Sequence, residues 1–198
     1  MARYIGPKLK ISRRFGMKLG LRTNEEALTR KPYRPGAQGA KGRRGRPSEY
    51  SLQLGEKQKA KFIYGILERQ FRNYYEKASK SQNVGLALLQ LLESRLDTVV
   101  YRSGYALTQN QARQFVTHRH VLVDGKNVNI PSFQTHPGMK ISLDPKLATL
   151  VEDQRGHVAD LPAWLRGGGK ETEVLALPTR EQIATPLDEQ LILEFYSR

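Results

Sequence analysis

The segment of residues 108–120 is rich in side chains that hold phosphate and sugar groups. Guanidinium, imidazole, amide and hydroxyl groups donate hydrogen bonds to phosphate oxygens and ribose hydroxyls, and no carboxylate interrupts them here. This combination is typical of a small RNA-binding module. With three flanking positions, the candidate donors are Arg102, Thr108, Gln109, Gln111, Arg113, Gln114, Thr117, His118, Arg119, His120, Lys126 and Ser132.

A short helix is predicted to position most of these donors. Thr108 and Gln111 form a capping box, in which each side chain satisfies a backbone N–H at the start of the helix. Ala112, Phe115 and Val116 then form its buried side. The donors therefore fall on another face and gather where the helix ends.

A β-hairpin is predicted to follow that helix. Asp124-Gly125-Lys126 lies between the apolar runs 121–123 and 128–130, and Asp-Gly in such a place is a strong hairpin signal because glycine tolerates positive φ. Pro131 ends the second strand.

Two longer helices are predicted upstream, over residues 56–78 and 84–102, with a break at 79–83 and with Gly104 placed to end the second. The first carries an apolar stripe, so most of its aromatic residues are expected in the core. Among the aromatic residues of the two helices, only Tyr75 or Tyr101 is expected to contact RNA. Three cations fall on the face opposite the stripe and are further RNA-binding candidates: Lys61, Arg69 and Arg72.

Positive charge is concentrated at the amino terminus. Residues 1–48 hold 14 Lys and Arg against 2 acids, residues 49–120 hold 11 against 6, and residues 121–198 hold 8 against 11. Residues 32–47 can bury almost nothing, which predicts that the segment is disordered in the free protein. We expect it to become ordered on RNA, and a flexible linker is the alternative. The candidates here are Arg3, Lys8, Lys10, Arg13, Arg14, Lys18, Arg34, Lys41, Arg43, Arg44 and Arg46.

The overall composition points the same way. The 198 residues carry a net charge of +14 with a pI near 10.1, so an anionic polymer is the simplest partner. The absence of cysteine excludes disulfides and thiolate metal sites, and the four histidines are not spaced as helical metal ligands. No apolar run approaches the roughly 20 residues that cross a bilayer, so no membrane partner is expected.

The carboxy-terminal third is less informative. Residues 167–169 are three glycines and predict a loop, Trp164 is expected to anchor that loop, and residues 191–196 are predicted to form a strand.

Several short tracts resemble the family of small-subunit ribosomal protein four. Those of its RNA-binding domain are Arg95-Leu96-Asp97, Gln111-Ala112-Arg113-Gln114, His118-Arg119-His120, Val123-Asp124-Gly125 and Ile130-Pro131-Ser132. Others along the chain are Glu56-Lys57-Gln58-Lys59, Tyr64-Gly65, Glu68-Arg69-Gln70, Glu189-Gln190-Leu191 and Glu194-Phe195-Tyr196-Ser197-Arg198. The chain departs from the family at Met139, where an acidic residue is frequent, and it lacks the amino-terminal cysteines with which some members hold zinc. The likeness is therefore to the zinc-free bacterial or plastid form.

The resemblance implies an α+β fold: a mainly helical domain with an inserted helix-helix-β-hairpin RNA-binding domain (alpha-L motif) and a basic, extended amino-terminal segment. The implied division is residues 1–48 for the extension, partly disordered without RNA, 49–93 with 157–198 for the helical body, and 94–156 for the RNA-binding domain. It also implies a structural constituent of the small ribosomal subunit that binds 16S rRNA, nucleates assembly of the 30S body, lines the channel where mRNA enters and influences translational accuracy. Its partners would be 16S rRNA, neighbouring small-subunit proteins and mRNA, in the cytoplasm or the plastid stroma, with no cofactor, metal or small-molecule substrate.

Three other functions share features with this sequence. A stand-alone RNA chaperone would not need the matching upstream helix and carboxy terminus, whereas a protein that represses its own mRNA could use the same surface. Pseudouridine synthases resemble the triplet Arg95-Leu96-Asp97 around their catalytic aspartate, but here Asp97 lies inside the binding module and no separate domain remains to form a catalytic pocket. We therefore expect no enzyme, and expect Asp97 to pair with a nearby arginine or to cap a backbone group.

Overall fold

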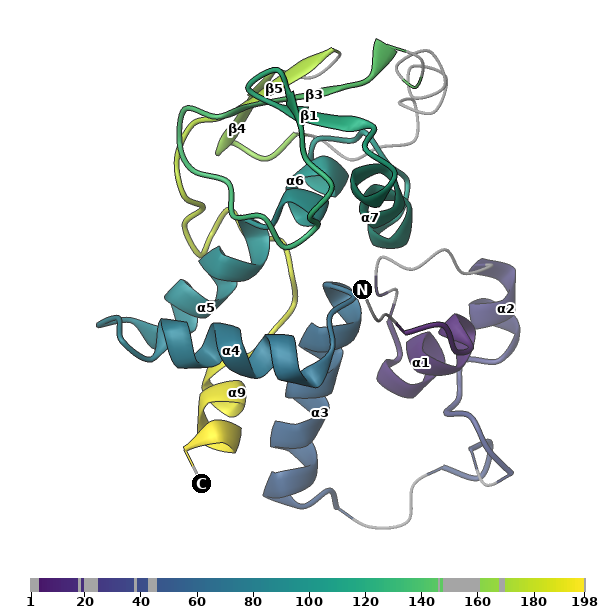
Figure 1. Cartoon of the computed structure of the whole chain (residues 1–198). Coiled ribbons are helices and arrows are strands. Elements are labelled where there is room, and N and C mark those ends of the chain that lie inside the picture. Colours follow the sequence, from purple (N-terminus) through teal and green to yellow (C-terminus); the bar gives the residue numbers. More distant parts are fainter. Residues whose placement is uncertain are drawn as a thin grey trace. The chain divides into compact units, whose positions relative to one another are not determined.

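A computed structural model describes residues 4–17, 19, 25–37, 39–42, 46–145, 147, 161–167 and 170–197 of the chain (Figure 1). The chain divides into two compact units. The first unit comprises Met1–Arg72 and Pro186–Arg198, and the second unit comprises Asn73–Thr185.

Helices make up the regular structure described in the first unit: α1 (Lys8–Phe15), α2 (Glu25–Arg30), α3 (Glu49–Ile63), the beginning of α4 (Glu68–Ala78) and α9 (Glu189–Tyr196). The yellow helix α9 lies along α3 (Figure 1). Aromatic rings fill the space between elements: Phe71 stacks on Tyr196 with centroids 6.1 Å apart, and Phe62 contacts both Tyr4 and Phe15.

The single helix predicted over residues 56–78 is wrong in extent, because the chain forms two helices there. The first begins earlier, where the Ser48 hydroxyl accepts a hydrogen bond from the Ser51 N–H. It ends at Ile63, and Gly65, which follows the cap residue Tyr64, has a left-handed φ of 61°, while the Ile66 N–H bonds back to the Lys61 carbonyl. This closure is the usual glycine-terminated helix end.

The strand predicted over residues 191–196 is also wrong, because this segment is the helix α9. The Asp188 carboxylate accepts hydrogen bonds from the Gln190 and Leu191 N–H groups and so caps the helix start. A short apolar run fits a buried strand as well as a buried helix, and here packing against α3 decides for the helix.

The second unit packs helices against one face of a sheet. Besides the end of α4, the helices whose bounds lie wholly within the described part of this unit are α5 (Val84–Glu93), α6 (Leu96–Arg102) and α7 (Gln109–Thr117). Its strands are β1 (Val121–Val123), β2 (Lys126–Asn127), β3 (Lys140–Leu143), β4 (Leu165–Gly167) and β5 (Glu171–Val174). Among the described residues they form one antiparallel sheet in the order β2-β1-β3-β5-β4.

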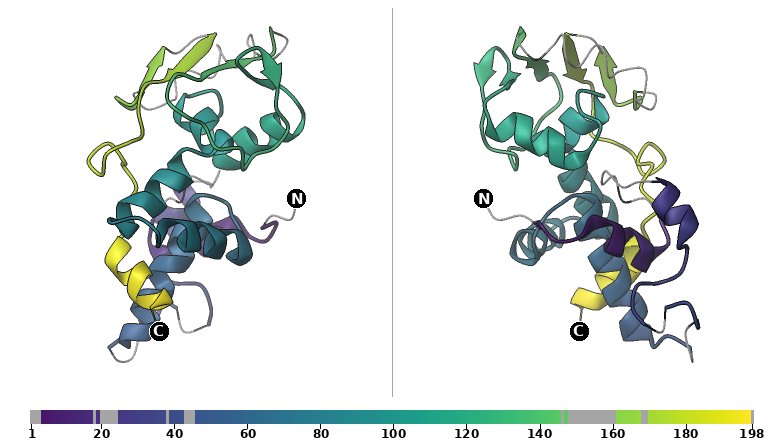
Figure 2. Two further views of the ribbon diagram at one scale, coloured as in Figure 1. Left: turned by 60° about the vertical axis from the view of Figure 1, so that its left-hand side comes forward. Right: turned by 90° about the vertical axis from the view of Figure 1, so that its right-hand side faces the viewer.

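The helices α6 and α7 lie on one side of this sheet (Figure 2), and the core of the second unit fills the space between them and the sheet. Val99 and Val116 from the helices and Ile141 from the sheet are fully buried. Trp164 is 2% exposed in the same core, so the prediction that it anchors this segment is confirmed. Of the three predicted loop glycines, Gly167 belongs to β4, and residues 168–169 lie outside the described part.

The helix predicted over residues 84–102 is interrupted at Ser94 and Arg95. Arg95 has extended backbone, with φ −67° and ψ 138°, and forms an isolated bridge with Gln134. The N–H groups of Leu96 and Asp97 donate to the carbonyls of Phe133 and Pro131 instead of to the preceding turn. Hydrogen bonds to a segment some 36 residues away thus replace helical ones; no local signal announces this break.

The predicted hairpin forms, with a tighter turn than expected. Asp124 and Gly125 have φ of 48° and 76°, so two residues with positive φ make the turn and Lys126 already pairs with Val123. Such a turn matches the twist of the two strands. The predicted second strand at residues 128–130 is therefore displaced, and strand pairing lies at Lys126–Asn127.

Candidate nucleic-acid interface

The start of α7 confirms the predicted cap. The Thr108 hydroxyl accepts a hydrogen bond from the Gln111 N–H at 3.2 Å, and the Gln111 side-chain oxygen accepts one from the Leu107 N–H at 2.9 Å. Ala112 and Val116 are fully buried, as predicted for the inner side of this helix. The sequence pattern therefore predicts both the residue at which α7 begins and the face of α7 that is buried.

Polar side chains gather at the other end of α7, in what we call the α7-end cluster: Gln114, Thr117, His118, Arg119 and His120. The Thr117 hydroxyl donates to the Arg113 carbonyl at 2.7 Å, so toward a ligand it can only accept. His120 is half-buried and the other four are exposed. Arg119 has a φ of 65°, and its N–H and that of His120 bond back to the carbonyls of Val116 and Phe115, which closes the helix. The histidine rings lie with centroids 6.2 Å apart. The cluster thus presents one permanent cation and several donors or acceptors on a backbone fixed by hydrogen bonds.

Two predicted binding residues of α7 face inward. Gln109 is 3% exposed and donates to the Thr98 hydroxyl at 3.1 Å. Arg113 is 8% exposed, and its Nη1 donates to Asp97 Oδ2 at 3.2 Å. Both side chains tie α7 to α6, so their direct partners are protein groups.

A buried ionic network explains the inward turn of Arg113. Arg95 donates to Asp97 through Nε at 2.9 Å and Nη2 at 2.6 Å, and its Nη1 donates to the Tyr74 hydroxyl at 2.8 Å. Both Arg95 and Asp97 are almost fully buried. The expectation that Asp97 pairs with a nearby arginine is confirmed, twice over.

Electrostatics keep Arg95 charged. Burial by itself would lower the pKa of Arg95, but the Asp97 carboxylate and its hydrogen bonds raise that pKa above its ordinary value. Arg95 therefore stays a cation inside the core, and the Asp97 carboxylate is occupied by two guanidinium groups. Such a carboxylate is poorly placed to act as a base or nucleophile on a substrate.

The remaining candidates of the second unit differ in exposure. Lys126 is exposed in β2, whereas Thr108, Gln111 and Ser132 are half-buried. Arg102 donates to the buried Glu93 carboxylate through two nitrogens at 3.0 and 2.7 Å, so its guanidinium is largely held by protein.

The candidates of the first unit lie on several elements. Exposed among them are Lys10, Arg14, Arg34, Lys41, Arg46, Arg69 and Arg72, while Lys8, Arg13 and Lys61 are half-buried. Lys61 donates to Glu68 at 2.7 Å, which makes it part of a protein ion pair. Arg3, Lys18, Arg43 and Arg44 lie outside the described residues.

The sequence-based candidates omitted Arg95 and Tyr74, which hold the binding helices in place without reaching the surface. The spacing Arg-x-Asp at the start of α6 was the only local signal for Arg95. Tyr74 was expected in the core, as found, but its hydroxyl partner lies 21 residues away in sequence. Within the described part, no three His, Asp or Glu side chains lie close enough to hold a metal ion. No helix there is long and apolar enough to span a membrane.

Comparison with known proteins gives two family matches that together span residues 3–141. Residues 3–93 match the ribosomal protein S4/S9 N-terminal domain, and residues 94–141 match the S4 domain. Proteins named small ribosomal subunit protein uS4 align over the full length of both chains, with 50% identity in Dictyoglomus thermophilum, 48% in Chlorobaculum tepidum and 46% in Thermus thermophilus. The predicted α+β class, a helical domain joined to a domain with an antiparallel sheet, is confirmed.

Proposed function

Since the chain belongs to the family of small ribosomal subunit protein uS4, we propose that it binds 16S rRNA directly as a constituent of the small subunit. That family is a structural ribosomal protein and not an enzyme. We place the protein in the cytoplasm or the plastid stroma. The full-length match to proteins of that name is the observation that carries the proposal. The described surface supports it, because the exposed cations and donors of the chain are of the kinds that contact phosphate and ribose.

We assign the direct contacts to side chains that are exposed or half-buried and not consumed by ion pairs. In the second unit these are the α7-end cluster, Lys126, Thr108, Gln111 and Ser132. In the first unit they are Lys8, Lys10, Arg14, Arg34, Lys41, Arg46 and Arg69. Arg3, Lys18, Arg43 and Arg44, which lie outside the described residues, are added for their charge alone. Gln109, Arg113 and Arg102 support the surface from behind through Thr98, Asp97 and Glu93.

The finer roles rest on the family resemblance. They are nucleation of 30S body assembly, contacts with neighbouring small-subunit proteins, lining of the channel where mRNA enters, and an influence on decoding accuracy. The same resemblance suggests a division into an extension over 1–48, a helical body of 49–93 with 157–198, and an RNA-binding domain over 94–156. Nucleation of assembly and lining of the mRNA channel would each place this basic surface against RNA phosphate, which is consistent with the excess of positive charge before residue 121.

Sedimentation tests the proposal. Native protein recovered from its own cells is expected to travel with small subunits through a high-salt sucrose gradient, because an integral ribosomal protein is held by contacts with RNA and with neighbouring proteins together, and salt weakens only the ionic ones. Release into the soluble fraction would contradict the structural role and would point to a transient assembly factor or an RNA chaperone.

A further inference from the structure

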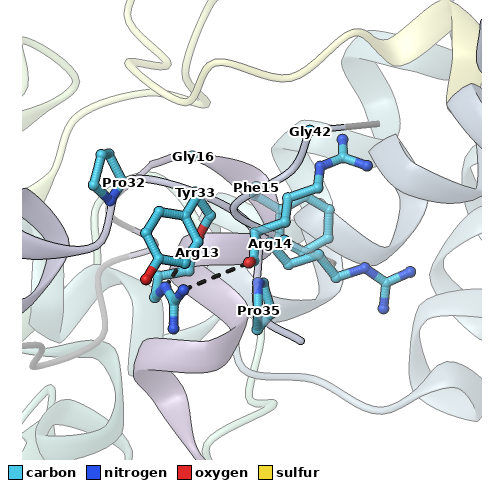
Figure 3. A pocket seen from close by; sticks show the side chains of 10 residues that line it. Arg13, Arg14, Phe15, Gly16, Pro32, Tyr33, Pro35 and Gly42 are labelled. Carbon is cyan, nitrogen blue, oxygen red and sulfur yellow. Dashed lines mark hydrogen bonds between the residues drawn. The ribbon is translucent and has the colours of Figure 1, made fainter. Parts of the chain in front are cut away.

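A pocket of about 760 Å³ lies within the first unit, between the end of α1 and the loop formed by residues 32–37 and 39–42 (Figure 3). Its volume is in the range of pockets that hold small organic ligands. The wall contains the guanidinium groups of Arg14 and Arg34 and the rings of Phe15 and Tyr33. No carboxylate lines it among the residues that the structure describes, so nothing there opposes an anion.

Arg13 gives the pocket its shape. Its Nε donates to the carbonyls of Lys31 and Tyr33 at 3.0 and 3.1 Å, and its Nη2 reaches the Arg34 carbonyl at 3.5 Å. The same guanidinium lies over the Tyr33 ring, 4.9 Å from its centroid, as Figure 3 shows. Arg13 was predicted to bind RNA, but its donors are used to hold this loop against α1.

Glycines let the loop fold so closely. The Gly39 N–H donates to the Gly36 carbonyl at 3.0 Å, and Gly36 and Gly42 have φ of 113° and 76°. A Cβ on Gly39 would collide with the carbonyl of Arg34. The glycine-rich composition, which predicts disorder by its lack of apolar groups, therefore also meets the steric demands of these turns.

The open groups of the pocket are of two kinds. Arg14 and Arg34 are exposed, so their guanidinium groups are available for bidentate hydrogen bonds to phosphate oxygens. Tyr33 remains 38% exposed although Arg13 covers one face, and Phe15 lies beside the Arg14 guanidinium, 5.8 Å from it. Aromatic faces stack with nucleobases, and a phosphate alone would not need them.

We propose that this pocket holds one unstacked nucleotide, with its base against the rings of Tyr33 and Phe15 and its phosphate on Arg14 and Arg34. The inference rests on the proposed RNA-binding function, because a single-stranded part of a bound RNA is the natural source of such a nucleotide. A free nucleotide offers the same chemistry and is the other source.

Nuclear magnetic resonance of the full chain tests the pocket directly. Adenosine 5′-monophosphate is expected to shift the amide signals of Tyr33, Gly39 and Gly42, and ribose 5-phosphate, which lacks the base, to bind at least about fivefold more weakly because it loses the stacking contribution. Equal affinities would overturn the base site and leave a plain anion site. Unmoved signals would overturn the proposal altogether.

Matched variants locate the binding groups. Arg14→Gln and Tyr33→Leu are each expected to weaken adenosine 5′-monophosphate binding at least about fivefold, while Arg30→Gln, which removes an exposed charge from α2 outside the pocket, leaves it unchanged. Arg14→Gln should weaken both probes and Tyr33→Leu only the one with a base. An equal loss in Arg30→Gln would reduce the effect to general charge and contradict the pocket.

Two further experiments ask whether the nucleotide comes from RNA or is free, and whether the pocket and the proposed RNA binding stand or fall separately. A short single-stranded oligoribonucleotide that displaces the mononucleotide supports RNA as the source, whereas failure to displace it overturns that source in favour of a free nucleotide. Filter binding of 16S rRNA by the same protein separates the two proposals. If the protein binds 16S rRNA but the pocket binds no nucleotide, only the nucleotide site is refuted. If the protein does not bind 16S rRNA, the proposed function is refuted.

Discussion

Arg95 and Asp97 lie two residues apart and form a two-pronged ion pair inside the core of the second unit, with Nε–Oδ1 and Nη2–Oδ2 distances of 2.9 and 2.6 Å. Arg113 of α7 joins the same carboxylate. A single buried carboxylate therefore pairs with two guanidinium groups and ties the helix that carries the α7-end cluster to the rest of the unit.

Asp97→Asn is expected to lower the free energy of unfolding by about 3–5 kcal/mol, because it leaves two buried guanidinium groups without their counter-charge. Urea denaturation measures this loss. The control is Glu171→Gln, which breaks an exposed pair with Lys140 at 3.8 Å and should cost about 0–1 kcal/mol. Equal losses in the two variants would mean that the buried network contributes little.

Arg119→Gln is expected to weaken RNA binding with little effect on stability, whereas Arg113→Gln is expected mainly to lower stability. The exposed Arg119 touches RNA in the proposed function, so its loss should reduce the slope of log affinity against log salt by about 0.7–0.9 while the free energy of unfolding changes by about 0.5 kcal/mol or less. Arg113→Gln should instead lower that free energy by about 1–3 kcal/mol, because it leaves part of a buried carboxylate unsatisfied. Arg166→Gln, an exposed change in β4, serves as the control for both filter binding and urea denaturation. A stable Arg113 variant with lost RNA affinity would show that Arg113 contacts RNA.

RNA affinity is expected to fall steeply with salt. If about 6–10 phosphates are neutralised, the association constant for 16S rRNA should drop by about 10³–10⁵ between 50 and 200 mM salt, since each contact releases condensed counterions. Filter binding across that range measures the drop. A flat response would contradict a phosphate-based interface.

Glu68 should make the first unit sensitive to acid. Burial alone would raise its pKa, but hydrogen bonds from Lys61, Lys57 and Tyr196 lower it to about 2, below the ordinary 4.5. The folded state thus favours the charged carboxylate: its stabilisation is complete above pH 4.5 and is lost as the pH falls toward 2.

Glu68→Gln tests this expectation. The side chain is nearly half exposed, so solvent screens its ion pairs and the variant should lose only about 1 kcal/mol at pH 7. The difference from the unmodified protein should shrink between pH 4.5 and pH 3 in urea denaturation, while the exposed Glu181→Gln shows no such trend. A difference that stays constant with pH would mean that Glu68 acts through packing.

Local signals determined much of this protein from its sequence. The capping residues Thr108 and Gln111 set the start of α7, and Asp124-Gly125 set the hairpin, because caps and positive φ act over a few residues. The excess of basic residues before residue 121 pointed to an anionic polymer in the same way, since charge needs no fold to be counted.

Tertiary structure decided the rest, because it depends on partners far along the chain. The break between α5 and α6 comes from hydrogen bonds to Pro131 and Phe133, and α9 is a helix through its packing on α3. Arg113 lies in α7 and Arg119 lies just beyond its end, and the two look equivalent in sequence. Only the position of Asp97, 16 residues from Arg113, turns the first inward as a support and leaves the second at the surface.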